Sequence, residues 1–316
     1  MSNTPLASVI VPNWNGAHLL GACLASLRVQ RYPRVEVVVV DGASRDGSVE
    51  LVSQQFPEVK LIRLPTNRGF TGNVNAGLQA AGGNVLALLN NDAEAEPAWL
   101  DELVTALTAD DRIGSAAAKI LHQHDRRTIA SAGDLLHRSG RAEQRGNGQP
   151  DDGRFDQPIE VFSASGGAVA YRRAMLADVG PFDERFGSYL EDVDLGLRGH
   201  LRGWRCHFAP EARVYHVVSA TGGGPLASFH VARNTVRLVA RGFPPAALRA
   251  CWAELVRLQL ERARDAARAW RGAAARATLR GQLAGLLELP AALRSRQAVQ
   301  AGRTISDAEF IALLAP

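Results

Sequence analysis

The chain has 316 residues, of which 46% are hydrophobic and 22% charged, a composition typical of a globular protein with a full hydrophobic core. No run reaches 18 consecutive apolar residues, which excludes a membrane-spanning helix, and the N-terminus lacks a signal-peptide pattern. The three cysteines are far apart and lack metal-ligand spacing, which fits a reducing compartment, so we expect a cytoplasmic protein.

The net charge of +4 conceals an uneven distribution along the chain. Residues 233–303 hold fourteen arginines, no lysine and four acidic residues, a net charge of +10, which leaves −6 for the rest. A basic segment attached to an acidic body indicates an anionic partner for that segment.

The first 120 residues alternate between strand-like and helix-like patterns, which favours a mostly parallel sheet with helices on both faces. The continuous β-branched run at 35–40 is typical of a strand buried on both sides. We predict strands at 8–11, 35–40, 59–64, 85–89 and 113–119, and helices at 17–30, from an Asp46 cap to 56, at 70–81 and from Pro97 to 107.

The second half begins with a polar, weakly patterned stretch at 122–158, which predicts long loops with a hairpin. Further predicted strands are 161–171, interrupted at Gly166-Gly167, and the short pair 205–208 and 213–216, with helices between them. Past residue 228 the pattern is helical to the end, with breaks at Pro244-Pro245, Gly272 and Pro290.

Three carboxylates gather at Glu191, Asp192 and Asp194, directly before a run with helical periodicity. Glu191 and Asp192 are adjacent and repel each other when both are charged. At a helix N-terminus the dipole and the free N–H groups would stabilise them, keeping a carboxylate ionised and ready to accept a proton. The alternative is an acidic first turn with Asp192 or Asp194 as the helix cap.

Polar residues also end two of the predicted buried strands, where ligands bind in open parallel sheets. Asp41 could accept a hydrogen bond from the N3–H of a uracil or thymine base, and Asn90-Asn91-Asp92 could hold a divalent metal against a diphosphate. Asp41, Asp92 and the lone His216 are also compatible with structural roles. The chain lacks both GxGxxG after the first strand and GxxxxGK[ST], which weighs against a dinucleotide cofactor and a P-loop.

Seven short segments together match a known pattern. The chain resembles the inverting glycosyltransferases of family 2, which have the GT-A fold, and within them the rhamnosyltransferase-like branch. The segments occur in the family's order and cover about residues 6–240. They are SVIVPNWNG at 8–16, VVVVDGASRDGS at 37–48, NRGFTGNVNAGL at 67–78, LALLNNDAE at 86–94, SGGAVAYRRAMLADVGPFDERF at 165–186, YLEDVDLGLR at 189–198 and ARVYHVVSAT at 212–221.

The resemblance implies a GT-A catalytic domain over residues 1–240, Rossmann-like with flanking helices, and a basic amphipathic helical extension over 241–316. It implies that Asp192 is the catalytic base, with Glu191 tuning or positioning it. The remaining implied site residues are Asp92 and His216 for the metal, Pro12, Trp14, Asn15, Asp41, Asn67, Gly69, Phe70, Gly72, Asn75, Asn90 and Asn91 for the nucleotide sugar, and Gly166, Gly167 and Asp194 on the acceptor side.

Two positions depart from the family pattern. Gly42 stands where Asp or Asn is usual, and Asn73-Val74 stands where the branch usually has Gly-Asn. Both departures concern the contacts to the donor.

The implied activity is an inverting transfer of a sugar, which depends on Mn²⁺ or Mg²⁺. The best match is L-rhamnose from dTDP-rhamnose, passed to a hydroxyl of a glycan or lipid-linked glycan in cell-surface polysaccharide synthesis. The alternatives are a UDP-hexose or UDP-galactofuranose transferase of the same family and a non-catalytic relative that binds nucleotide sugars or glycans.

The C-terminal segment contains an amphipathic stripe: Leu248, Trp252, Leu255 and Leu258 share one helix face, with arginines off that face. The stripe would lie on an anionic membrane, making the protein peripheral on the cytoplasmic face of the inner membrane, or pack on the catalytic body or a second subunit. Trp252 and Trp270 are too few stacking aromatic residues for a nucleic-acid site, so no such partner is expected.

Overall fold

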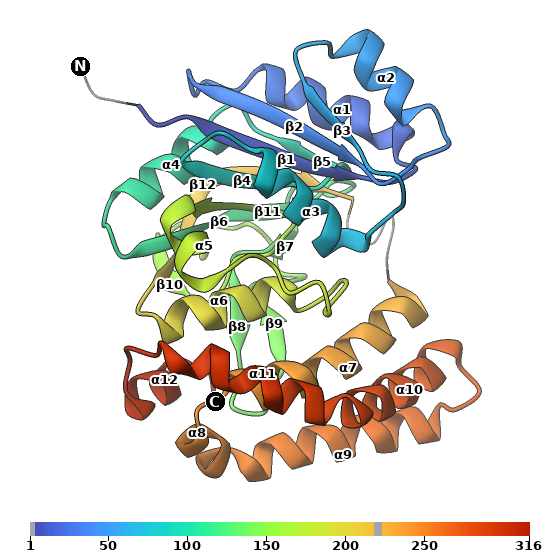
Figure 1. The fold of residues 1–316 in the computed structure, drawn as a ribbon, viewed down its shortest axis with the longest axis vertical. Coiled ribbons are helices and arrows are strands. Elements are labelled where there is room, and N and C mark those ends of the chain that lie inside the picture. The colour runs from blue at the N-terminus through green and yellow to red at the C-terminus, as the bar shows by residue number, and fades with distance from the viewer. Residues whose placement is uncertain (1–3, 218–222) are drawn as a thin grey trace.

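The structure is a computed structural model that describes residues 4–217 and 223–316. A mixed sheet with helices on both faces forms the body, and a second layer of helices, α7 to α12, packs against one side of it (Figure 1). The prediction of an α/β protein with a mostly parallel central sheet and a C-terminal helical extension is confirmed. The last four residues of the predicted segment at 212–221 lie outside the described residues.

The predicted alternation of strands and helices in the first 120 residues is confirmed within a few residues at each end. The strands are β1 (Ala7–Asn13), β2 (Val35–Asp41), β3 (Lys60–Arg63), β4 (Val85–Leu89), β5 (Ala93–Ala95), β6 (Ile113–His122), β7 (Ile129–Ser131), β8 (Asp134–Leu136), β9 (Ala142–Gln144), β10 (Ile159–Val161), β11 (Ala168–Arg172) and β12 (Arg205–His216). The helices are α1 (Ala17–Arg28), α2 (Ser48–Gln55), α3 (Gly69–Ala80), α4 (Trp99–Thr108), α5 (Arg173–Val179), α6 (Glu191–Leu201), α7 (Gly224–Gly242), α8 (Pro245–Ala250), α9 (Trp252–Arg268), α10 (Ala273–Leu287), α11 (Leu289–Ala301) and α12 (Asp307–Leu313).

The strand order of the main sheet brings the polar strand ends together. The order is β10-β12-β6-β11-β4-β1-β2-β3, in which β3, β2, β1 and β4 are parallel and β11 runs antiparallel between β4 and β6. The carboxyl ends of β1, β2 and β4 therefore share one edge. Because β11 is antiparallel, its beginning lies at that same edge, with Ala168 opposite Leu89.

The packing of α3 on the sheet depends on a glycine. A Cβ atom at Gly77 would lie 2.4 Å from Cγ2 of Ile10 and 3.0 Å from Cγ2 of Val40, well inside van der Waals contact. The missing side chain lets the helix backbone approach β1 and β2 closely. This contact places the start of α3 at the edge of the sheet where the parallel strands end.

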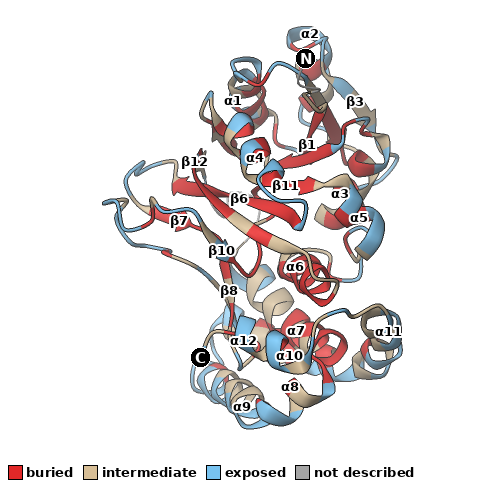
Figure 2. Cartoon of the chain, turned by 90° about the vertical axis from the view of Figure 1, so that its left-hand side faces the viewer, coloured by how far each residue is buried: buried red, intermediate tan, exposed pale blue. Residues whose placement is uncertain are grey.

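Helix α6 is enclosed by two hydrophobic clusters. Leu195 belongs to the cluster on the sheet, whereas Leu197 and Leu201 belong to a second cluster with Leu238 of α7 and Phe310 of α12. Figure 2 shows α6 coloured as buried between the sheet and the C-terminal helices. The C-terminal helices thus complete the burial of the helix that carries the acidic cluster.

Three local predictions are wrong. Residues 205–216 form one strand rather than two, with an irregularity between Ala209 and Arg213, because β12 pairs with β6 on both sides of it. Strand 161–171 is interrupted at Gly166-Gly167 as predicted, since β11 begins at Ala168, but the part before the interruption is not a strand, because β10 ends at Val161 and pairs with β12. Asp46 is not the N-cap of α2, which is Gly47. The Asp46 carboxylate instead accepts hydrogen bonds from the N–H groups of Ala17 and Ser48, and so connects the starts of α1 and α2.

The C-terminal stripe does not share a single environment. Leu248 and Leu255 pack against the cluster between α6 and the C-terminal helices, whereas Trp252 is 64% exposed. Part of the positive charge of residues 233–303 is paired with acidic residues earlier in the chain, because Arg237 and Arg241 of α7 form ion pairs with Asp183. The charge asymmetry of the sequence is therefore partly neutralised inside the protein.

Candidate active site

The ends of β1, β2 and β4 are joined by a chain of side-chain hydrogen bonds. Asn13 donates from Nδ2 to Oδ1 of Asp41 over 3.2 Å and accepts at Oδ1 from Nδ2 of Asn91 over 2.7 Å. Asp41 also accepts a hydrogen bond from the Ser44 N–H over 2.9 Å, and all three of the linked side chains are buried. Asn13 is not among the residues predicted for the site, although it ends a strand just as Asp41 does.

The loop after β1 is shaped to face the loop after β2. Asn15 has a left-handed backbone (φ 49°), and its Oδ1 accepts a hydrogen bond from the Arg45 N–H over 2.8 Å. Trp14 is half exposed beside it, whereas Pro12 lies within β1 itself. The structure therefore brings Asn13, Asn15 and Asp41 into one group at the strand ends.

The two departures from the family pattern are neighbours in space. A Cβ atom at Gly42 would lie 2.7 Å from Nδ2 of Asn73 and 3.0 Å from Oδ1 of Asn67. The Asn73 amide thus fills the space that a side chain at position 42 would enter, and it donates to Asn67 over 3.2 Å. Asn67 also accepts from the N–H of Gly69, whose φ of 72° favours glycine.

A second group lies at the end of β4 and β12. His216 Nε2 lies 2.8 Å from Oδ1 of Asp92 and 3.3 Å from Nδ2 of Asn90. The backbone holds the same pair together, because the Val217 N–H donates to the Asp92 carbonyl over 3.0 Å. Asp92 is buried and the His216 side chain is 15% exposed, so Oδ1 and Nε2 meet in a partly enclosed place.

The Asp92–His216 pair fits a divalent cation that takes its remaining ligands from a diphosphate and water. A carboxylate oxygen and an imidazole nitrogen that converge within one hydrogen-bond length are donors suited to Mn²⁺. Among the described residues, no group of three or more His, Cys, Asp or Glu side chains could hold a metal alone. A nucleotide-bound metal, held by few protein ligands, is the type of site this arrangement favours.

The acidic cluster at the start of α6 lies across a glycine pair from the Asp92–His216 pair. Asp192 accepts hydrogen bonds from the N–H groups of Gly166 and Val193, each over 2.8 Å. A Cβ atom at Gly167 would lie 3.4 Å from Cε1 of His216. The backbone of Gly166-Gly167 therefore runs between the two polar groups and leaves space for a ligand to reach both.

One cavity of about 780 Å³ contains both groups. Asn90, Asp92 and His216 line it at the β4 side, and Glu191, Asp192 and Asp134 line it at the α6 side, with Phe70 and the glycine pair between them. Asp41 and the residues around it lie outside this lining, at the neighbouring strand ends.

Three predicted site residues have structural partners instead of a place along the cavity. Asn75 bonds the backbone of Phe182, donating over 2.9 Å and accepting over 3.1 Å. Asp194 is buried and pairs with Arg198 over 2.8 Å and with Arg241 over 3.4 Å. Gly72 is buried against the Arg68 side chain.

The prediction that the helix start keeps the carboxylates ionised is wrong for Glu191. Burial raises the pKa of Glu191 well above its ordinary value, and the neighbouring charge of Asp192 raises it further. Its Oε2 is buried and has no hydrogen-bond partner among the described residues. The N-cap of α6 is Leu190 in the left-handed conformation, so the prediction of Asp192 or Asp194 as the cap is also wrong.

Two opposing effects act on the pKa of Asp192. Burial raises its pKa, while the hydrogen bonds from the Gly166 and Val193 N–H groups favour the ionised form. A carboxylate with a raised pKa that still receives two N–H donors is suited to take up a proton near neutral pH. Asp134 lines the same cavity and is not among the predicted site residues, because it lies in a weakly patterned stretch without a recognisable motif.

Comparison with known families now identifies the class of protein. Residues 8–180 match the model of Glycosyl transferase family 2, and residues 141–254 match that of Glycosyl transferase family group 2. The first match spans more than half of the chain. The chain belongs to glycosyltransferase family 2, and the prediction of a glycosyltransferase enzyme is confirmed.

Two relatives illustrate the range of the family. The chain is 31% identical over 233 residues to the O-antigen biosynthesis protein RfbC of Myxococcus xanthus. This match covers 69% of this chain and 18% of that protein. It is 28% identical over 253 residues to N-acetylglucosaminyl-diphospho-decaprenol L-rhamnosyltransferase of Mycobacterium tuberculosis, covering 72% of this chain and 82% of that enzyme.

Solved structures agree on the fold. The mannosyltransferase PcManGT from Pyrobaculum calidifontis, in complex with GDP-Man and Mn²⁺, superposes with a TM-score of 0.56 at 22% identity, covering 98% of this chain and 79% of that one. GalNAc-T7 with UDP, GalNAc and Mn²⁺ gives a TM-score of 0.64 at 21% identity, covering 78% and 49%. The GT-A fold prediction is thereby confirmed.

The buried carboxyl of Asp134 predicts how stability depends on pH. Burial, and then the charge of Asp192, raise its pKa well above the ordinary value. At about pH 4 the group is protonated in the folded state and about half protonated in the unfolded state, so ionisation costs the fold little there. As the pH rises from there towards the raised folded pKa, the unfolded state gains by ionising, so the folded state loses stability.

Asp134→Asn should therefore unfold at the same denaturant concentration as the parent near pH 4 and at a higher one at pH 8. At pH 8 the free energy of unfolding of the variant should exceed that of the parent by about 1.4 kcal/mol for each unit by which the folded pKa of Asp134 exceeds the unfolded pKa, up to pH 8. Urea unfolding at both pH values measures it, with the fully exposed Asp111→Asn as the control. A variant that is less stable than the parent at pH 8 would contradict this interpretation of the acidic cluster.

Proposed function

We propose that the protein transfers a sugar from a nucleotide sugar to an acceptor hydroxyl with inversion at the anomeric carbon. The supporting observation is that Asp192 and the Asp92–His216 pair line one cavity on either side of Gly166-Gly167. A donor lying across the glycine pair would direct its diphosphate to one side and its anomeric carbon to the other.

The chain's own residues supply the remaining steps of this mechanism. Asp41 and Asn67 offer hydrogen-bonding groups for the base and ribose at the strand ends, and the buried amides of Asn13 and Asn73 hold them in position. Asp192 accepts the proton of the acceptor hydroxyl as that oxygen attacks, and the Gly166 N–H fixes the position of its Oδ2. Asp92 and His216 would hold the divalent ion, which neutralises charge on the leaving diphosphate when bound.

We further propose L-rhamnose from dTDP-rhamnose as the donor and a glycan or lipid-linked glycan of the cell surface as the acceptor. Support comes from the rhamnosyltransferase of Mycobacterium tuberculosis, which aligns over 82% of its length, and from RfbC. A UDP-sugar donor is the alternative, since TarS of S. aureus, solved in complex with UDP-GlcNAc, shares the fold at a TM-score of 0.55. Thermal shifts with a panel of nucleotide sugars and Mn²⁺ distinguish the two.

The wall of the cavity is consistent with an acceptor that has an apolar part. Leu226 and Val231 of α7 line it together with Tyr189 and Leu190. Leu226 is 50% exposed there and is accessible to such a part of an acceptor.

We also propose that the helical extension over 241–316 binds an anionic membrane surface. Trp252, Val256 and Leu260 are each about half exposed or more on α9, at a spacing of four residues. The side chain of Gln282 in α10 donates to the Gln259 carbonyl and thereby holds α10, which exposes Leu283, against α9. No described helix is long and apolar enough to cross a bilayer.

The arginines around this surface favour lipid over a second copy of the chain. Arg257 and Arg264 are exposed on α9, and no ion pair is recorded for them among the described residues. Pairing two copies through this face would bring like charges together, whereas anionic headgroups would neutralise them.

The base assignment predicts different outcomes for two adjacent carboxyls. Asp192→Asn should lower the transfer rate about 10²–10⁴-fold while donor affinity stays near that of the parent, because only proton removal is lost. Glu191→Gln should cost far less, because the Glu191 carboxyl is buried with a raised pKa and its Oε2 has no hydrogen-bond partner among the described residues. Turnover assays with calorimetric donor titrations measure both. A greater rate loss in Glu191→Gln than in Asp192→Asn would contradict the assignment.

The metal assignment predicts a change in binding that needs no turnover. Asp92→Asn should remove the Mn²⁺-dependent part of donor affinity and leave the metal-free affinity unchanged, because a neutral amide is a poor ligand for a hard cation. Calorimetry with Mn²⁺ and with a chelator measures this difference. Asp46→Asn, outside the cavity, is the control. Undiminished Mn²⁺ dependence in Asp92→Asn would contradict the proposal.

The membrane proposal predicts that removing exposed apolar side chains of α9 weakens binding to vesicles containing anionic lipid. Trp252→Ser with Leu260→Ser should reduce co-sedimentation with vesicles containing anionic lipid at least about tenfold, because each exposed side chain gives up about 1.5–3 kcal/mol of burial. Binding to neutral vesicles should be weak in both proteins. Equal binding of the parent to anionic and neutral vesicles, or dimerisation through this face in sedimentation velocity, would contradict it.

A further inference from the structure

The segment between α5 and α6 has an unusual backbone just before the acidic cluster. Tyr189 and Leu190 follow each other with φ of 68° and 67°, and Gly187 has φ of 74°. For residues with a side chain, the left-handed conformation costs about 1–2 kcal/mol each. Two such residues in succession persist only if surrounding contacts hold them in place.

The main contact comes from a single buried amide on α7. Nδ2 of Asn234 lies 3.1 Å from the carbonyl oxygen of Phe186, 3.0 Å from that of Ser188 and 2.7 Å from that of Tyr189. Asn234 is fully buried. These three carbonyl oxygens are hydrogen-bond acceptors, so the side chain facing them must be a donor. The NH₂ group of Asn234 fills that role.

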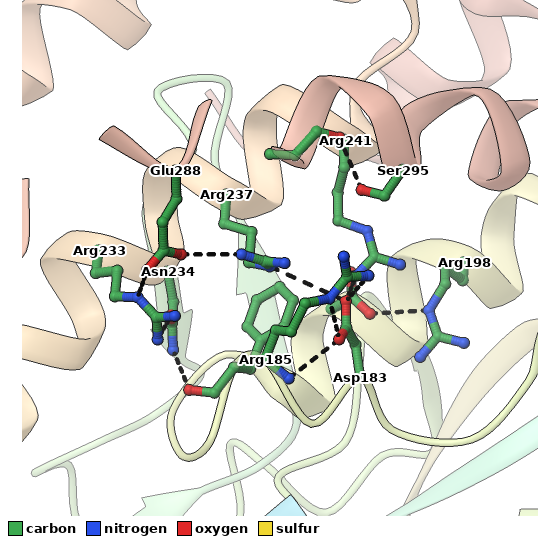
Figure 3. A network of polar contacts seen from close by, with 12 residues as sticks. Asp183, Arg185, Arg198, Arg233, Asn234, Arg237, Arg241, Glu288 and Ser295 are labelled. Carbon is green, nitrogen blue, oxygen red and sulfur yellow. Dashed lines mark hydrogen bonds and ion pairs between the residues drawn. The ribbon is translucent and has the colours of Figure 1, made fainter. Parts of the chain in front are cut away.

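Ion pairs hold α7 against the same segment. Arg241 pairs with Asp183, which lies in the segment, and approaches Asp194 of α6 at 3.4 Å. Arg237 pairs with Glu288 over 3.0 Å, which fixes α7 to the end of α10. Figure 3 shows Arg185, Arg237 and Arg241 gathered around Asp183, with Asn234 beside Arg233 and Glu288.

Helix α3 holds the segment from its other side. Thr71 donates from its backbone N–H to the Gly187 carbonyl over 3.2 Å, and Asn75 bonds both the N–H and the carbonyl of Phe182. The segment is thus held between α7 and α3, and Phe70 of α3 also lines the cavity.

We propose that Asn234 is a positioning residue of the active site. Its amide holds Tyr189 and Leu190 in the left-handed conformation, and this conformation sets where α6 begins and where Asp192 stands opposite Gly166. Asn234 lies outside the cavity lining and therefore acts through the backbone of residues 186–190. This inference rests on the proposed role of Asp192 as the base.

Two variants test the proposal. Asn234→Asp keeps the size of the side chain but removes both N–H donors. Asn234→Ala removes them without placing a carboxylate against three carbonyls. Both should lower kcat, by about 100-fold for a misplacement of the base of about 1 Å, while the dissociation constant of the donor stays within about twofold. Backbone amides of residues 187–194 should exchange hydrogen faster than in the parent.

Thr235→Val is the matched control. Thr235 is the next residue on α7 and equally buried, but its hydroxyl bonds the Val231 carbonyl and Arg262, away from the segment. This variant should retain the parental kcat and the parental exchange at 187–194, even if its melting temperature falls as far as that of Asn234→Ala.

Three results would each overturn the proposal: parental kcat in a folded Asn234→Ala, an equal loss of kcat in Thr235→Val, or parental exchange at residues 187–194 in Asn234→Ala. The exchange measurement separates this inference from the proposed function, because it needs neither donor nor turnover. If the parent transfers no sugar but Asn234→Ala still speeds exchange at 187–194, the transferase proposal fails and the role of Asn234 in the segment stands. If exchange there is unchanged, the role of Asn234 is refuted whatever the activity.

Discussion

The active-site arrangement depends on the burial of α6 between the sheet and the C-terminal helices. This helix presents Leu195 to the sheet and Leu197 to α7, so neither face is free to turn towards solvent. At its start, Glu191 is buried and Asp192 is partly buried where they meet the cavity. The raised pKa of Glu191 follows from this constraint, as does the need for N–H donors at Asp192. A surface helix with the same sequence would carry ordinary, ionised carboxylates.

The second determinant is the antiparallel insertion of β11 between β4 and β6. A fully parallel sheet would place the start of β11 at the opposite edge, far from the ends of β1 and β4. Running antiparallel, it delivers Gly166-Gly167 to the edge where Asp92 lies, and these glycines leave the space between His216 and Asp192 open. The C-terminal helices complete the arrangement, since α7 contributes to the cavity wall and holds the segment before α6. Helix α7, most of which precedes residue 241, thus connects the cavity to the helices that follow it.

Local patterns in the sequence predicted much of this, and long-range contacts account for what they missed. The β-branched run of β2 and the polar residues at 41 and 90–92 identify strands and strand ends without reference to any other part of the chain. Asn75 and Asn234 each donate a hydrogen bond to a backbone carbonyl more than forty residues away along the chain, and no local sequence pattern reveals such a contact. The single strand β12 was likewise missed because its continuity comes from pairing with β6.

The central claim is that a nucleotide sugar spans Gly166-Gly167 between the Asp92–His216 pair and Asp192. A crystal structure of the protein with donor and Mn²⁺ tests it most directly. We expect the diphosphate and the ion at Asp92 and His216, the base near Asp41, and the anomeric carbon open to an acceptor oxygen within hydrogen-bond reach of Asp192. A donor bound with its anomeric carbon turned away from Asp192, or with its diphosphate away from Asp92, would contradict this account.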